Sequence, residues 1–300
     1  MLRLPAATAL LVYQGTLPLG TSRHRIPYAC VSPDVSAGEC MSAYTEHSFP
    51  SAAVENLFTL GYAVLDDAFT TEESDTLEMA MRLIDDGIML QEEAQDGRDD
   101  AIRFVDEQSA MLPIQDAMRK LKGYGESLQS SYTIARAKED SAWSAPWTSK
   151  PGSGTIEQLT PRLPATSMRL LTAAPVAQLA SYPPGGVYCV HSDNSRDEAG
   201  KRRNERALTA ILYANPSDWS DDDGGHLRIW TNTDEVDCNV GDPSTLGETL
   251  RATSAAYVDV LPLPGRVVFF RSSLAHEVCP SVLRPRRAIT QWFFAPYNED

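Results

Sequence analysis

The sequence predicts an α+β fold in which a mainly β core, a double-stranded β-helix or jelly roll, is braced by N-terminal helices. Three observations predict this fold. Amphipathic helical patterns are confined to roughly residues 70–135. From about Val176 onward, short apolar, β-branched and aromatic runs recur between turn residues without helical periodicity, as is typical of a sandwich or jelly roll. No internal repeat is found in the sequence, so a repeat architecture is not expected.

Composition narrows the class of protein. The 300 residues are 42% hydrophobic and 22% charged, which is ordinary for a globular chain. The longest uncharged apolar run, Leu4–Tyr13, is too short to cross a bilayer, so no membrane partner is expected. The formal net charge is −15, and the only basic run is Lys201–Arg203. A nucleic-acid partner is therefore not expected, because the field of the chain repels phosphates.

Residues 1–48 differ in composition from the rest. No acidic residue precedes Asp34, and Ala, Ser, Thr and Leu dominate. This composition is typical of an organellar targeting segment, and a disordered tail is the alternative. We therefore expect one domain over residues 49–300, and a monomer by default. Five cysteines without a CxxC pair favour reduced thiols and a cytoplasmic location, with organellar targeting by residues 1–33 left open.

A strand is predicted at Tyr62–Asp66, before the two predicted helices. Thr70 and Glu73 have the spacing of a capping box, and the helix that follows is predicted to end at Gly87. A second helix, with Met111, Ile114, Met118 and Leu121 on one face, is predicted to stop at Gly123. Residues 138–165, rich in Pro, Ser, Thr and Gly, predict a long loop that contains Trp143 and Trp147.

The β-helix core is predicted over residues 170–296. Seven runs predict its strands: Val176–Tyr182, Val187–Asp193, Leu208–Ala214, His226–Trp230, Tyr257–Leu261, Arg266–Phe270 and Ala288–Ala295. Proline and glycine separate these runs, which places the connections in turns.

One of these strands carries two residues of a candidate metal site. His191 and Asp193 are two residues apart on a predicted strand, so their side chains point to the same face. His276 follows a later strand and a short loop, where it would complete a set of two histidines and one carboxylate. That set is the facial triad of non-haem Fe(II) oxygenases. An HxD pair is also common by chance, and either histidine alone could be structural.

Arg286 strengthens the interpretation. It stands ten residues after His276, directly before the strand that begins at Ala288. A guanidinium aimed into a barrel needs a counter-ion, and a dicarboxylate such as 2-oxoglutarate supplies one. Tyr213 would offer its hydroxyl to the same carboxylate. The alternative is that Arg284, Arg286 and Arg287 form a solvated basic turn.

At the level of motifs, residues 182–294 resemble the catalytic core of the Fe(II)/2-oxoglutarate-dependent prolyl hydroxylases, most closely the type that hydroxylates hypoxia-inducible factor. The motifs that carry the resemblance are Tyr182-Pro-Pro-Gly-Gly, Tyr188-Cys-Val-His-Ser-Asp193, Leu208-Thr-Ala-Ile-Leu-Tyr213, Gly224-Gly-His-Leu-Arg228, His276-Glu-Val278 and Arg286-Arg-Ala-Ile-Thr290-Gln-Trp292. A weaker resemblance extends upstream, so that it covers about residues 50–296.

The resemblance implies a role for each site residue. His191, Asp193 and His276 would hold Fe(II), and Arg286 and Tyr213 would bind 2-oxoglutarate, with Thr290 and Tyr182 lining the same pocket. It also implies O2 as co-substrate, ascorbate as an auxiliary reductant, and hydroxylation of a prolyl residue in a protein or peptide with formation of succinate and CO2. An oxygen-sensing role would follow from the family alone. Two alternatives remain open: the same chemistry on a free amino acid or other small metabolite, and a degenerate oxygenase fold used as a binding module.

Overall fold

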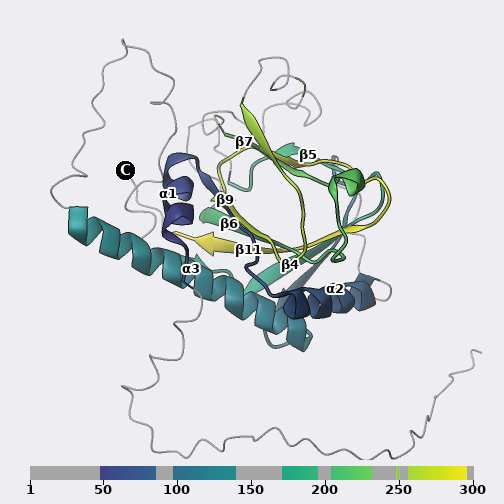
Figure 1. The fold of residues 1–300 in the computed structure, drawn as a ribbon, viewed down its shortest axis with the longest axis horizontal. Coiled ribbons are helices and arrows are strands. Elements are labelled where there is room, and N and C mark those ends of the chain that lie inside the picture. Colours follow the sequence, from purple (N-terminus) through teal and green to yellow (C-terminus); the bar gives the residue numbers. More distant parts are fainter. Residues whose placement is uncertain are drawn as a thin grey trace, which may run out of the picture. The chain divides into compact units, whose positions relative to one another are not determined.

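Two antiparallel sheets form the core of the protein (Figure 1). The computed structural model describes residues 48–85, 97–139, 171–194, 204–231, 248, 250 and 256–295. The predicted segment 1–48, except Ser48, and residues 140–165 of the predicted loop lie outside the described residues. No helix among the described residues is long and apolar enough to cross a membrane.

The larger sheet has the strand order β1-β9-β6-β11-β4-β2, with β3 pairing to β11 in addition. Its strands are β1 (Tyr62–Leu65), β2 (Ala101–Asp106), β3 (Thr172–Ala173), β4 (Val176–Tyr182), β6 (Arg206–Tyr213), β9 (Val267–Arg271) and β11 (Arg286–Phe294). The smaller sheet has the order β5-β10-β7-β8, with β5 (Tyr188–His191), β7 (Leu227–Trp230), β8 (Tyr257–Val260) and β10 (His276–Val278). Two such sheets confirm the predicted jelly-roll fold.

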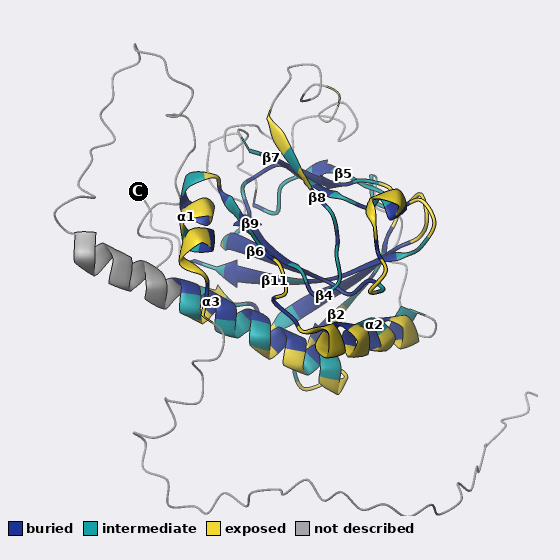
Figure 2. Ribbon diagram, viewed as in Figure 1, coloured by how far each residue is buried: buried dark blue, intermediate teal, exposed yellow. Residues whose placement is uncertain are grey.

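Successive side chains along each strand of the larger sheet point to opposite faces, so the sheet divides the core into two layers. One face packs on the helices through residues such as Leu179, Phe269 and Phe293. The other face, which includes Ala180, Ala288 and Phe270, is turned toward the smaller sheet. Figure 2 shows both layers as buried ribbon, with exposed residues on the outer sides of the helices. The functional pocket lies in the layer between the sheets.

Three α-helices brace the larger sheet: α1 (Ser51–Thr59), α2 (Thr71–Asp85) and α3 (Leu112–Glu139). The predicted capping box is present at the start of α2, where Glu73 N–H donates to Thr70 Oγ1 and Thr70 N–H donates to Glu73 Oε2. The described part of α2 ends at Asp85. A short 3-10 helix, η3 (Asp221–Asp223), lies before β7.

The predicted end of the second helix at Gly123 is wrong, since α3 continues to Glu139 and so includes the first residues of the predicted 138–165 loop. Glycine lowers helix propensity, but packing decides the outcome here. A Cβ at Gly125 would clash with the ring of Phe293 on β11. The glycine therefore lets the helix approach the sheet closely, and the close contact maintains the helix through a sequence that disfavours it.

A network of charged side chains attaches α2 to β11. Arg287 Nε donates to Asp85 Oδ2 at 2.9 Å and its Nη1 lies 3.7 Å from Glu78 Oε1, while Ser181 Oγ donates to Asp85 at 2.7 Å. The side chain of Arg287 is only 9% exposed. This buried placement overturns the alternative of a solvated basic turn for Arg287.

We expect Arg287→Ala to lower the free energy of unfolding by about 2–4 kcal/mol, because it leaves the partly buried Asp85 carboxylate without its cation. Urea denaturation measures this change. Arg82→Ala is the matched control: Arg82 lies 3.7 Å from the same Glu78, but its side chain is 62% exposed. The control should change stability by less than about 0.5 kcal/mol. Equal effects of the two substitutions would contradict a stabilising role of the network.

Candidate active site

The two histidines meet because the strands that carry them are neighbours. His191 ends β5 and His276 begins β10, and the antiparallel pairing sets these two residues directly opposite each other. Their ring centroids are 4.2 Å apart. Asp193 follows β5 by two residues. The potential ligand atoms of His191, Asp193 and His276 all lie within 4.8 Å of one another.

Backbone hydrogen bonds fix the tautomer of both imidazoles. The Nδ1 atom of His191 lies 2.9 Å from the carbonyl oxygen of Cys189, and that of His276 lies 2.9 Å from the carbonyl oxygen of Leu274. A carbonyl only accepts, so each Nδ1 carries the proton and each Nε2 keeps a free lone pair. Hydrogen bonds of this kind are the usual support of metal-binding histidines.

The electrostatics of the cluster also suit a cation. Burial, reinforced by the neighbouring His276, lowers the pKa of His191 to about 3, so the imidazole is neutral and able to coordinate. Burial alone would raise the pKa of Asp193. The two histidines and the hydrogen bond from Thr209 outweigh it and hold that pKa below its usual value. Two imidazole nitrogens and a carboxylate are a donor set that fits Fe(II).

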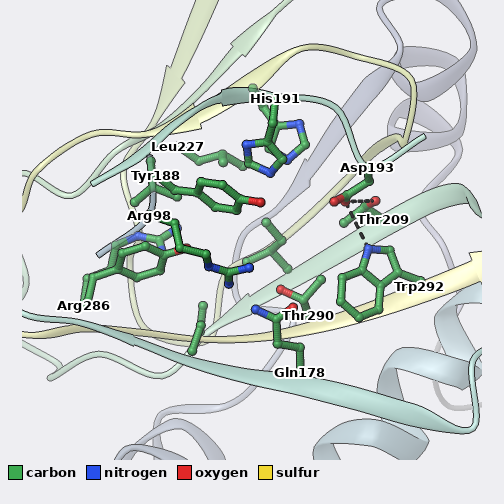
Figure 3. A pocket seen from close by; sticks show the side chains of 16 residues that line it. Arg98, Gln178, Tyr188, His191, Asp193, Thr209, Leu227, Arg286, Thr290 and Trp292 are labelled. Carbon is green, nitrogen blue, oxygen red and sulfur yellow. Dashed lines mark hydrogen bonds between the residues drawn. The ribbon is translucent and has the colours of Figure 1, made fainter. Parts of the chain in front are cut away.

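The cluster opens onto a pocket of about 440 Å³, part of which is open solvent. Cross-strand registers of the larger sheet arrange its floor in rows (Figure 3). From the cluster inward, the rows are Trp292 with Thr209; Gln178 with Thr290 and Ile211; Ala180 with Ala288; and Tyr182 with Arg286. The two alanines extend no further than Cβ, which leaves room between the polar rows.

Arg286 lies at the inner end of this pocket. It is 1% exposed, and its Nε donates to the carbonyl oxygen of Gly225 at 2.9 Å. Gly225 has φ +74°, and a Cβ there would lie 3.2 Å from the Arg286 side chain, so glycine is needed at this contact. The rings of Tyr182 and Tyr213 both lie near Arg286, each with its centroid 5.1 Å from the guanidinium carbon.

Two buried polar atoms at this end have no hydrogen-bond partner among the described residues. Among the described residues, Arg286 Nη2 and the Tyr213 hydroxyl are buried without a hydrogen bond, and no carboxylate forms an ion pair with Arg286. Burial raises the pKa of both tyrosines, which keeps their hydroxyl groups protonated. A buried cation without an anion is costly. The inner end of the pocket therefore fits a carboxylate.

A second arginine in the pocket wall is already neutralised. Arg98 donates to both carboxylate oxygens of Asp100, at 2.5 and 2.8 Å. Its guanidinium lies 4.5 Å from the ring centroid of Tyr188, and that ring in turn stacks on His191 at 3.6 Å. Arg98 therefore supports the orientation of His191 and leaves Arg286 as the cation available to an anion.

Six of the seven predicted site residues line the pocket: His191, Asp193, His276, Arg286, Thr290 and Tyr182. Tyr213 packs against Arg286 and is not part of the lining. Sequence reasoning gave no role to Arg98, Gln178 or Thr209. Gln178 and Thr209 carried a signal, since each is a polar residue inside an apolar strand. Arg98 carried none, because the strand β2 beside it was not predicted.

The fold and the site define a class of protein, and the comparisons with known proteins agree. Residues 177–294 match the family model described as the 2OG-Fe(II) oxygenase superfamily. This span includes every pocket-lining residue except Arg98. Residues 177–294 are therefore similar to the 2OG-Fe(II) oxygenase superfamily, in agreement with the predicted fold and donor set.

Many solved structures are similar to this chain, among them two prolyl hydroxylases and EctD. A prolyl-4-hydroxylase from Pseudomonas putida is 21% identical, with a TM-score of 0.53 over 82% of this chain and 98% of its own. A prolyl hydroxylase from Trichoplax adhaerens, bound to a peptide of the hypoxia-inducible factor oxygen degradation domain, is 22% identical, with a TM-score of 0.50 over 81% and 87%. EctD from S. alaskensis, with 2-oxoglutarate and 5-hydroxyectoine, is 16% identical, with a TM-score of 0.52 over 84% and 78%.

Proposed function

We propose that this protein is an Fe(II)- and 2-oxoglutarate-dependent dioxygenase that hydroxylates a prolyl residue of a protein substrate. The observation that carries the proposal is the pocket itself, with a His-Asp-His cluster at one end and, at the other, Arg286 without a carboxylate partner among the described residues. A ligand that joins the two ends needs metal-chelating oxygens and a distal carboxylate. 2-Oxoglutarate has both.

Each residue then has a defined task. His191 and His276 would hold the iron through Nε2, and Asp193 would hold it through a carboxylate oxygen. Arg286 and the Tyr213 hydroxyl would bind the distal carboxylate, with Tyr182 and Thr290 along the same wall. When bound, the metal with 2-oxoglutarate and O2 supplies the oxidation, which yields succinate and CO2. The protein contributes orientation and an enclosed pocket.

An aromatic wall of the pocket beside Asp193 favours the proposal that the substrate is a prolyl residue. The ring of Trp292 lies in the pocket with the Arg206 guanidinium 4.0 Å from its centroid. Phe104 lies 6.3 Å from Trp292 in a tilted arrangement and is 47% exposed, so this wall reaches the protein surface. Proline rings pack well on aromatic faces, and a surface-exposed wall can receive a peptide segment.

Turnover tests the proposal. The protein would be incubated with Fe(II), 2-oxoglutarate, O2, ascorbate (the reductant that the resemblance implies) and a library of proline-containing peptides. We expect peptide-dependent succinate and a peptide mass increased by one oxygen atom. The matched control is the same library with each proline replaced by alanine, which should give no oxidised peptide.

Other outcomes contradict parts of the proposal. A free amino acid or small metabolite that is hydroxylated as fast as any peptide would assign the site to small molecules. Absence of succinate with every peptide and metabolite tested, together with no binding of 2-oxoglutarate, would indicate a binding module. The oxygen-sensing role and the cytoplasmic location stay predictions from the sequence.

A further inference from the structure

The two carboxylate oxygens of Asp193 have different surroundings. Oδ2 accepts a hydrogen bond from Thr209 Oγ1 at 2.7 Å and a second from Trp292 Nε1 at 3.0 Å (Figure 3). Oδ1 has the Arg206 Nη1 atom 3.9 Å away, beyond hydrogen-bond distance. Two donors therefore occupy one oxygen and leave the other available.

The hydroxyl chain behind Oδ2 has a fixed direction. An ionised carboxylate accepts only, so the single proton of the Thr209 hydroxyl goes to Asp193. Ser272 Oγ lies 2.9 Å from Thr209 Oγ1 and must then donate to it. Both Thr209 and Ser272 are 0% exposed. The resulting chain runs Ser272 to Thr209 to Asp193, and each bond polarises the next.

The direction of the second hydrogen bond, from Trp292 to Asp193, is also fixed. An indole Nε1–H is a donor only. Trp292 lies on β11 opposite Thr209 on β6, so the sheet register brings both donors to the same side of Asp193. The rotation of the carboxylate is therefore restricted from two neighbouring strands.

We infer that Thr209 and Trp292 are positioning residues that make Asp193 a one-oxygen metal ligand, with Oδ2 committed to the protein and Oδ1 presented to the cation. This inference rests on the proposed function, because it concerns how the same site holds its metal. Loss of either donor would free the carboxylate to rotate, or to offer both oxygens to the cation, and would weaken metal binding.

The test is a titration of the full chain with Co²⁺ alone, followed by the visible absorption of the bound ion. We expect Thr209→Val, which keeps the shape of the side chain, to weaken Co²⁺ binding by about 10- to 100-fold. Trp292→Phe should weaken binding in the same direction. Both variants should also shift the cobalt absorption bands. A purely structural role would not produce this shift in protein that remains folded.

Two further variants sharpen the test. Thr209→Ser retains the hydroxyl and should restore Co²⁺ affinity to near that of the wild type. Thr76→Val makes the same threonine-to-valine change on the exposed side of α2, outside the pocket, and should leave Co²⁺ affinity and absorption unchanged. Thermal melting confirms that each variant is folded, and Trp292→Phe provides an independent test if Thr209→Val does not fold.

The outcomes separate the two proposals. If wild-type protein binds Co²⁺ and the Thr209→Val and Trp292→Phe variants match it in affinity and absorption, the positioning role is wrong and the metal site stands. If wild-type protein binds neither Co²⁺ nor Fe(II), the proposed function itself fails.

Discussion

Replacing Arg286 with alanine is expected to raise the 2-oxoglutarate concentration needed for half-maximal binding by roughly a hundredfold, or about 3 kcal/mol. The guanidinium is buried, has no carboxylate partner among the described residues, and presents Nη2 without a hydrogen bond. Its removal leaves a distal carboxylate of the ligand without its cation in a desolvated pocket. Arg286→Lys should give a smaller loss, because lysine keeps the charge without the planar fork.

An anaerobic titration measures this effect through the weak visible charge-transfer band of Fe(II) with 2-oxoglutarate. Arg119→Ala is the control, since Arg119 has a 53% exposed side chain on α3 and pairs with Asp116 on the same helix and with Glu107 in the preceding turn. It should bind 2-oxoglutarate as the wild type does. Unchanged affinity in Arg286→Ala would refute the assignment of the inner end of the pocket to a carboxylate.

The second large effect concerns the metal. His276→Ala removes one of three protein ligands and is expected to abolish turnover. Loss of a hydrogen bond to a metal ligand typically weakens metal binding by about 10- to 100-fold. We expect loss of the ligand His276 itself to weaken Fe(II) binding by more than this. His276 is 3% exposed and lies opposite His191, so no neighbouring histidine can replace it in the cluster.

Equilibrium Fe(II) binding and succinate formation would both be measured for this variant. His226→Ala is the matched control, because His226 lies outside the pocket, with its Nε2 atom 3.7 Å from Asp221 Oδ1. It should retain Fe(II) binding and turnover. Turnover by His276→Ala at the rate of the control would show that the cluster is not the metal site.

The sequence alone predicted the jelly-roll core because its strands have clear boundaries. The predicted strand Val176–Tyr182 has the same bounds as β4, and the other six predicted runs overlap β5, β6, β7, β8, β9 and β11. His191, Asp193 and Arg286 were identifiable because each lies on or beside one of these strands. The period-two pattern then placed the first two on one face.

The sequence pattern did not predict β10, α1 or the full length of α3, and each failure has a physical reason. β10 has only three residues, too few to show a period, so the pairing of His276 with His191 could not be read from the sequence. α1 follows Pro50 and buries only Ala53, Leu57 and Phe58, which is a short signal. α3 passes two glycines because Gly125 packs against Phe293, a contact that depends on the tertiary fold.

One strand carries both ends of the pocket floor. β11 bears Arg286 at its start and Thr290 and Trp292 further along, and it pairs with β4 on one edge and β6 on the other. The six residue steps from Arg286 to Trp292, in the row beside the metal cluster, span about 20 Å of uninterrupted strand. The interval between the carboxylate end and the metal end is therefore set by the repeat of an extended backbone. Because this strand is paired on both edges, that interval is rigid and would limit the length of a ligand that spans it.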